Sequence, residues 1–204
     1  MKKILILLLA AVVSITAVEA QQLSKRELKA QKKALQKEVA GYVAEGWKVL
    51  PGELNIGEQV TRSKSFKTAL DDNGEPKYVV AQVTAVGQTY KAALFAAQNG
   101  AKVQAANALK GELEQLTKID LANVEDANKE AISVDKVVSA AMERVSASLG
   151  QGVILTTMHR EVAHNGNVEI VFGCAYSYKK IKELAVEAQK KSLKEEIDEL
   201  RKQL

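Results

Sequence analysis

The strongest constraint on the fold is a run of apolar residues, from Tyr78 to Val86, that leads almost directly into a long alanine-rich stretch. In this run β-branched residues fall on both alternating sets of positions, which is typical of a strand flanked by others and covered on at least one face. From Thr89 to Leu116 a stripe of residues that are mostly alanine and glycine advances in steps of three and four positions, which indicates a helix. The sequence therefore predicts a strand at the centre of a sheet, followed by one long helix.

The predicted helix is built on small side chains, chiefly alanine and glycine. Each of them buries little area, because burial contributes roughly 0.8 kcal/mol per CH₂. The helix must therefore gain its stability from close approach of its backbone to the sheet and from the helix propensity of alanine. Gly100 costs about 1 kcal/mol relative to alanine inside a helix, so we expect it to mark either a close contact or a kink.

Residues 1–20 have the organisation of a secretory signal peptide. Lys2 and Lys3 form a charged start, an apolar stretch follows to Ala17, and residues 18–20 fit a cleavage site after Ala20. The apolar stretch is shorter than the ~20 residues that span a bilayer as a helix. Cys174 is the one cysteine, so there is no lipid-acceptor cysteine near the cleavage site and no internal disulfide. We expect a periplasmic or secreted protein without a transmembrane anchor after cleavage.

The charge balance argues against nucleic acid as a partner. The sequence has 29 basic and 25 acidic residues, and removing Lys2, Lys3 and Glu19 with the signal peptide leaves 27 and 24, a net charge of +3. This charge is too small to indicate a nucleic-acid-binding surface.

The mature chain divides into an N-terminal amphipathic helix at 21–45, an α+β domain at 46–177 and a C-terminal helix at 178–204. Ser24 and Glu27 form a capping box at the start of the first helix, and Leu28, Leu35 and Tyr42 form its apolar stripe. Its other side is basic and carries Lys25, Arg26, Lys29, Lys32, Lys33 and Lys37. That side is either a docking face for anionic lipid or polysaccharide or, as we favour, an ordinary solvated face.

Three further features are expected between 46 and 76. Residues 47–50 form a short strand that Pro51 stops, with Trp47 as a core residue rather than the wall of a pocket. Asn55 and Glu58 cap a second helix. The acidic residues at 71–75 form a turn, because they lack the ligand spacing of a calcium loop.

After the alanine-rich helix, we expect a connector at 118–123 and another helix at 124–149. Two strands follow, at 153–162 and 168–176, joined around Asn165 and Gly166, which is a strong hairpin signal. An odd loop of three residues places Ile154, Met158 and Val162 on the face shared by Ile170, Phe172, Cys174 and Tyr176. A two-residue loop would place His159 and Glu161 there instead, and we favour the odd loop.

The C-terminal helix carries a second apolar stripe that begins at Leu193 and resembles a heptad repeat. Its last turns either pack on the first helix or pair with a second molecule, which would make a homo-oligomer.

Few residues have the chemistry of a site. His159, His164, Met158 and Cys174 are the one set suited to a soft metal such as copper, but they lack a known ligand spacing. Cys174 is expected to be a small apolar residue in a strand. We therefore predict no catalytic, cofactor-binding or metal-binding residues, and no cofactor.

The order of features over residues 79–182 resembles the LPP-twenty type of bacterial envelope lipoprotein domain. A strand, an alanine-rich helix, a further helix and a hairpin are followed by Tyr178, Lys179 and Lys180. The alanine-rich helix contributes Ala93, Ala96, Ala97, Ala101, Ala105, Ala106, Ala108 and Leu109. The resemblance implies an α+β domain at the cell envelope with a structural or binding role. It supplies no catalytic residues, and membrane anchoring is not carried over because the lipid-bearing cysteine is missing.

Taken together, these features predict an α+β fold with a mainly antiparallel sheet of about four strands. Long alanine-rich helices cover the sheet, and amphipathic helices form the two ends of the chain. The predicted function is that of a non-enzymatic exported envelope protein with a structural or binding role, whose partners are envelope proteins or glycans. The alternative is a periplasmic protein that binds a small ligand or a metal.

Overall fold

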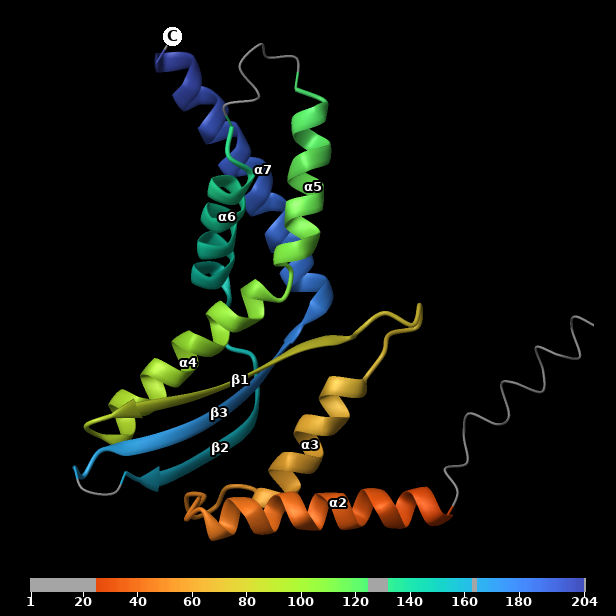
Figure 1. Cartoon of the computed structure of the whole chain (residues 1–204), viewed down its shortest axis with the longest axis vertical. Helices are drawn as coiled ribbons and strands as arrows, with labels where there is room; N and C mark the ends of the chain where they lie inside the picture. Colours follow the sequence, from red (N-terminus) through yellow and green to blue (C-terminus); the bar gives the residue numbers. More distant parts are fainter. Residues whose placement is uncertain (1–24, 125–131, 163–164, 204) are drawn as a thin grey trace, which may run out of the picture. The chain divides into compact units, whose positions relative to one another are not determined.

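The computed structural model describes residues 25–124, 132–162 and 165–203 and shows an α+β fold. This part of the chain contains six helices and a three-stranded antiparallel sheet (Figure 1). In chain order they are α2 (Lys25–Ala44), α3 (Ile56–Thr68), β1 (Tyr78–Gly87), α4 (Tyr90–Asn107), α5 (Lys110–Ala122), α6 (Val134–Ser148), β2 (Val153–Glu161), β3 (Val168–Ser177) and α7 (Tyr178–Gln203). The predicted signal peptide, the capping residue Ser24 and His164 lie outside the described residues.

The chain forms two compact units. One ends at Gly41 within α2, and the other is Tyr42–Leu204, which holds the sheet and the helices from α3 to α7. None of the described helices is both long enough and apolar enough to cross a bilayer.

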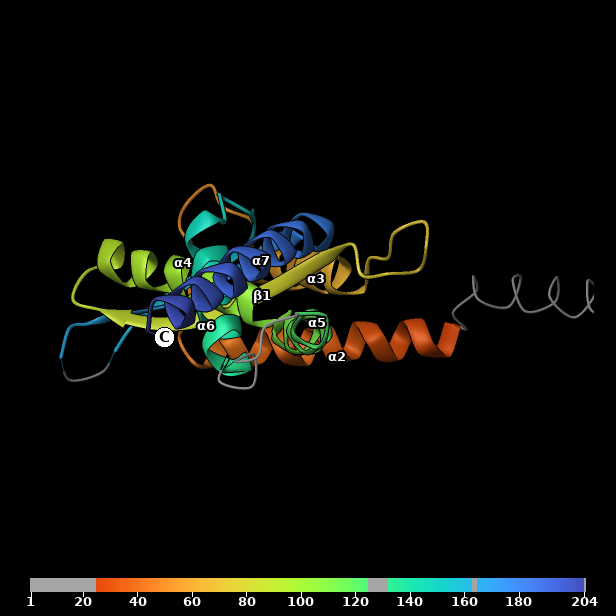
Figure 2. The same cartoon turned by 90° about the horizontal axis from the view of Figure 1, so that it is seen from above.

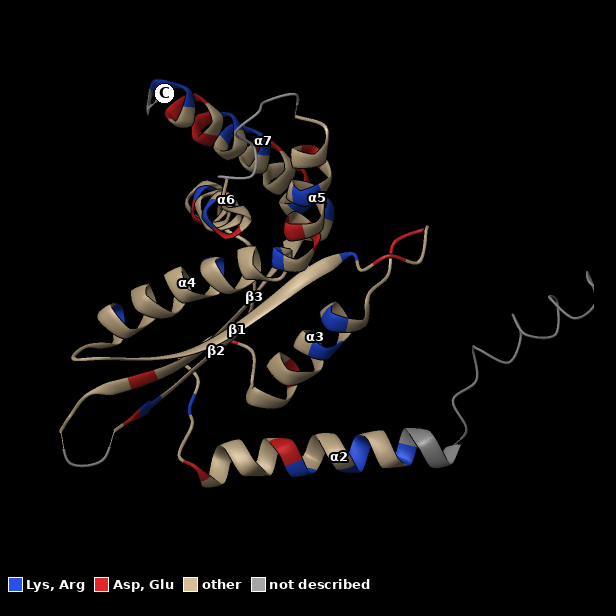
Figure 3. Ribbon diagram, turned by 45° about the horizontal axis from the view of Figure 1, so that its top comes forward, with Lys and Arg blue, Asp and Glu red and all other residues tan. Residues whose placement is uncertain are grey.

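The strand order is β1-β3-β2, so β3 is central and β1 lies at an edge. Both pairings are antiparallel, and Tyr78 lies opposite Ser177 at one end of β1. The prediction that the first strand is central is therefore wrong. Its apolar residues on both faces have another cause, because α4 lies against one face of the sheet and α3 against the other (Figures 1 and 3).

The fourth strand expected at residues 47–50 is reduced to a single bridge. Lys48 exchanges both backbone hydrogen bonds with His159, at N–O distances of 2.8 and 2.9 Å. Pro51 cannot donate to a ladder, and Gly52 turns the chain with a φ of 87°. The described sheet consequently has three strands rather than four.

The contact between α4 and the sheet is as close as the sequence predicted. Ala93, Ala97, Ala101 and Ala105 are all 0% exposed. A Cβ atom at Gly100 would lie 3.0 Å from Cγ1 of Val83, so this glycine marks a close approach to β1. The backbone of α4 therefore lies nearly against the side chains of β1, as expected for a helix with a small-residue stripe.

The alanine-rich segment forms two helices, not the single helix that was predicted. The break lies at Leu109, where the backbone turns with φ of −99° and ψ of 6° and the amide bonds to Ala106 instead of continuing the regular ladder. Leu109 is 2% exposed, so the turn places it in the core. The predicted connector at 118–123 is also wrong, because α5 continues to Ala122. The helix expected at 124–149 starts at Val134, and residues 125–131 lie outside the described part.

Helices α5, α6 and α7 lie together at one end of the sheet (Figures 1 and 2). Leu193 of α7 is buried with Ile132 and Val137, and Ile197 and Leu200 pack against this cluster. The C-terminal stripe thus has apolar partners within the same chain. Self-association through this helix stays a prediction.

The predicted odd loop between β2 and β3 is wrong. Glu161 lies opposite Val168, so the number of residues in the loop between them is even. His159 lies opposite Ile170, and Met158 therefore lies on the face of the sheet opposite to that of Ile170 and Cys174. Ile154 nevertheless lies opposite Cys174, as predicted, because a register shift between Ile154 and Thr156 changes the alternation. The hairpin turn itself is where the sequence indicated, with Gly166 at a φ of 68°.

A leucine at position 100 should destabilise the protein, because it would force α4 away from Val83. We expect Gly100→Leu to lower the free energy of unfolding by about 1–3 kcal/mol in urea denaturation. The matched control is Gly111→Leu on α5, where a Cβ would meet no atom within 4 Å. Equal stability of the two variants would contradict the close contact.

Candidate functional site

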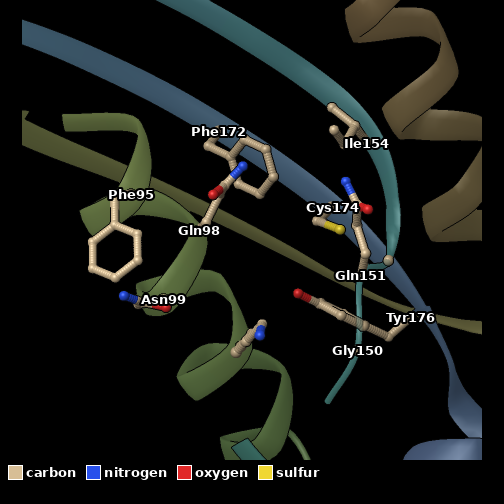
Figure 4. Close-up of a pocket in the computed structure, with 11 residues that line it drawn as sticks. Phe95, Gln98, Asn99, Gly150, Gln151, Ile154, Phe172, Cys174 and Tyr176 are labelled. Atoms are coloured by element: carbon tan, nitrogen blue, oxygen red, sulfur yellow. The ribbon is translucent and has the colours of Figure 1, made fainter. Parts of the chain in front are cut away.

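A cavity with a volume of about 210 Å³ lies on the α4 side of the sheet, between α4 and the start of β2 (Figure 4). Its floor consists of Phe172, Cys174 and Tyr176 of β3, each at most 7% exposed. The walls are α4, the segment after α6 and the first residues of β2. They contribute Phe95, Gln98, Asn99, Lys102, Gly150, Gln151, Gly152 and Ile154.

Gly152 shapes the end of the cavity nearest β2. A Cβ atom there would lie 2.5 Å from Sγ of Cys174 and 2.6 Å from the carbonyl oxygen of Ala175, so only glycine lets the chain pass this close to β3. This close passage helps to bury the Cys174 thiol, which is 2% exposed.

The ionisable groups of the floor are held in their neutral forms. Burial raises the pKa of the Cys174 thiol above its ordinary value of 9.0, against hydrogen bonds from Tyr176, Gly152 and Ala175 that act in the opposite direction. Burial also raises the pKa of the Tyr176 phenol, and the neighbouring thiol adds to that shift. Both groups therefore remain protonated at neutral pH.

The charge of the cavity comes from α4. Among the described residues that line it, Lys102 is the one charged side chain, and none of them is a carboxylate or a histidine. Gln98, Asn99 and Gln151 carry amides, which both donate and accept hydrogen bonds. The ring of Phe95, at the α4 wall, is 66% exposed. The cavity thus combines neutral hydrogen-bonding groups, one cation and an exposed aromatic ring.

The structure does not gather the residues considered for a soft metal. His159 contacts the ring of Tyr90 edge-on, with centroids 5.5 Å apart. Met158 and Cys174 lie on opposite faces of the sheet, because Met158 is opposite Val171. His164 is outside the described residues. Within the described ranges, no group of three or more His, Cys, Asp or Glu side chains is placed to hold a metal ion.

Trp47 is a core residue, as predicted. It is 6% exposed, and its indole nitrogen donates to Glu45 at 3.0 Å. The guanidinium of Arg160 lies 4.5 Å from the ring and also bonds Glu169 at 2.7 Å. The tryptophan therefore fixes the segment before α3 against the hairpin and does not line the cavity.

The acidic segment at 71–75 forms the predicted turn. Oδ1 of Asp71 accepts hydrogen bonds from the amides of Asn73 and Glu75, at 2.9 and 3.0 Å. Asn55 and Glu58 likewise form the predicted capping box of α3.

Sequence reasoning missed the residues that give the cavity its polarity. Gln98, Asn99 and Lys102 recur at a helical spacing beside the buried alanines, with Phe95 one turn earlier. This pattern was available in the sequence, but a polar stripe on a helix ordinarily faces solvent. Nothing in the sequence indicated that the Gly150 segment lies across from it.

Comparison of the chain with models of known families, with curated proteins and with solved structures finds no match. The resemblance to the LPP-twenty type of domain therefore stays a prediction. The structure has the expected order of strand, alanine-rich helix, helix and hairpin, with α5 inserted and α7 beginning at Tyr178.

Stability should fall in alkaline solution because of the buried floor of the cavity. Above the ordinary pKa values of 9.0 and 10.0 for Cys and Tyr, the unfolded chain releases protons that Cys174 and Tyr176 retain in the folded state. The free energy of unfolding therefore decreases as pH rises through this range. Urea denaturation between pH 8 and about 11 should show a smaller decrease for Tyr176→Phe than for the wild type. Parallel profiles would contradict the raised pKa of Tyr176.

Proposed function

We propose that the protein is a non-enzymatic exported protein of the cell envelope with a binding role, and that its cavity holds one unit of an envelope glycan that carries a carboxylate. The single observation that supports this most is the convergence of α4 side chains on a hollow with an uncharged floor. The remaining support comes from the size, the chemistry and the ionisation of the lining, and from the signal-peptide pattern of residues 1–20.

The size of the cavity favours a small group. At about 210 Å³ it is smaller than the ~300–1,000 Å³ typical of sites for drug-sized ligands. A single sugar ring or a comparable fragment fits this volume better than a nucleotide or another large cofactor. The rest of a longer glycan would extend over the surface.

The lining matches the chemistry of a sugar acid. Amides such as Gln98 and Asn99 can pair with hydroxyl groups, which also donate and accept. Lys102 offers a cation for a carboxylate. The exposed ring of Phe95 offers an apolar face against which the C–H face of a sugar can stack.

The ionisation of the floor favours binding over catalysis. A protonated thiol is a weak nucleophile, and a protonated phenol with a raised pKa is a poor base. Cys174 and Tyr176 are both of this kind. The lining residues within the described part supply no carboxylate or histidine that could activate them.

The proposal is tested by NMR titration of the chain from Gln21 with soluble saccharide fragments from digested peptidoglycan, which carry carboxylates. We expect shifts at Gln98, Lys102 and Gly152 with a Kd of about 0.1–1 mM. Lys102→Ala should weaken binding about tenfold, as expected for loss of a charge-assisted hydrogen bond.

The matched control is Lys91→Ala, which removes a lysine from the same helix but outside the cavity. Equal weakening by both variants would indicate non-specific charge attraction and contradict the proposal, as would the absence of shifts at the cavity. Binding of Cu²⁺ that is lost in His159→Ala would favour the metal-binding alternative.

A further inference from the structure

The two edges of the sheet are protected to very different degrees. At the β2 edge, Lys48 takes both backbone hydrogen bonds of His159, and Oε1 of Gln59 accepts from the amide of Thr157 at 2.8 Å. This strand also carries charges at Arg160 and Glu161. Covering segments and charges are the usual devices that stop a sheet edge from pairing with another chain.

The β1 edge lacks these devices over most of its length. None of the ten residues of β1 is charged, and the strand is drawn without charged residues in Figure 3. Oε1 of Gln104 accepts from the outward amide of Gln82 at 2.8 Å. Because the backbone N–H groups of alternate residues in a strand point to the same edge, those of Thr84 and Val86 also point outward, away from β3. Within the described residues, these two amides have no hydrogen-bond partner.

The space beside these two residues is open. Val86 is 51% exposed, and Thr84 is also exposed. On the α4 side, Gly100 lies against Val83, and the exposed residues one and two turns earlier are Ala96 and Ala92. Small side chains at these positions leave room for another strand to approach.

The sequence of β1 also permits pairing at this edge. The strand has a neighbour on one side alone within this chain, and it carries no charge that would oppose a second neighbour on the other side. A second copy of the chain can supply that neighbour. Under a two-fold axis, β1 meets an identical uncharged strand in antiparallel orientation, so no like charges oppose each other.

We infer that β1 pairs with β1 of a second copy and makes one continuous antiparallel sheet across the two subunits. In the register that keeps the Gln104 contact intact, Thr84 lies opposite the partner's Val86, and Val86 opposite the partner's Thr84. Each such pair exchanges both backbone hydrogen bonds. The Gln82 amide, already bonded to Gln104, bounds the paired segment in each subunit. This inference does not depend on the proposed glycan site.

Such a short pairing predicts a weak dimer, which sedimentation velocity of the chain from Gln21 should detect at concentrations up to about 0.5 mM. Hydrogen exchange by NMR locates the contact. The amides of Thr84 and Val86 should exchange more slowly as the protein concentration rises, whereas that of Gln82 should not change.

Thr84→Pro should make the protein monomeric, or weaken association at least about tenfold. Proline removes an outward amide that makes no bond to β3, and edge strands tolerate it at such positions. Thr84→Val, which keeps the amide, is the matched control and should still associate. Val86→Lys is a second disruptive variant, should the proline variant fail to fold, because it brings like charges together near the two-fold axis.

A wild-type chain that remains monomeric at the highest concentration would overturn the inference. So would a dimer that persists in both Thr84→Pro and Val86→Lys, which would place the contact elsewhere, such as on α7. A dimer whose Thr84 and Val86 amides gain no protection would have the same consequence.

Discussion

The close contact of α4 with β1 and β3 is the constraint on which the rest of the structure depends. Ala97 and Ala101 are completely buried there, and Gly100 brings the helix backbone within reach of Val83. Because the contact is made by small residues, each side chain contributes little burial and the geometry of the whole surface matters. The contact also determines where the cavity lies, because α4 packs along β1 and β3 and leaves a hollow beside the start of β2.

The features that the sequence predicted correctly are those that local patterns determine. The alanine contact follows from the spacing of small residues. The hairpin follows from Asn165 and Gly166, and Gly166 has the positive φ that a turn requires. The start of α7 at Tyr178 and the capping box at Asn55 are local as well. Each of these depends on residues within a few positions of one another, so neighbouring sequence carries the information.

The features that the sequence did not predict depend on contacts between distant segments. Leu109 lies among good helix formers, and its burial in the tertiary core accompanies the break between α4 and α5. The hairpin register includes a bulge in β2, where Thr156 lies opposite Gly173. A Cβ atom on that glycine would clash with the threonine hydroxyl. The cavity joins residues of α4, β2 and β3, whose spacing in the sequence shows no common pattern.

Native-state hydrogen exchange of the β1–α4 contact tests the account most directly. If this contact is the centre of the fold, the amides of Ala81, Ala97 and Ala101 should exchange only through global unfolding, with an opening free energy equal to that from urea denaturation. Exchange of these amides through local opening, at a free energy well below the global value, would show that the helix and strand separate while the rest stays folded. That result would contradict the central role of the contact.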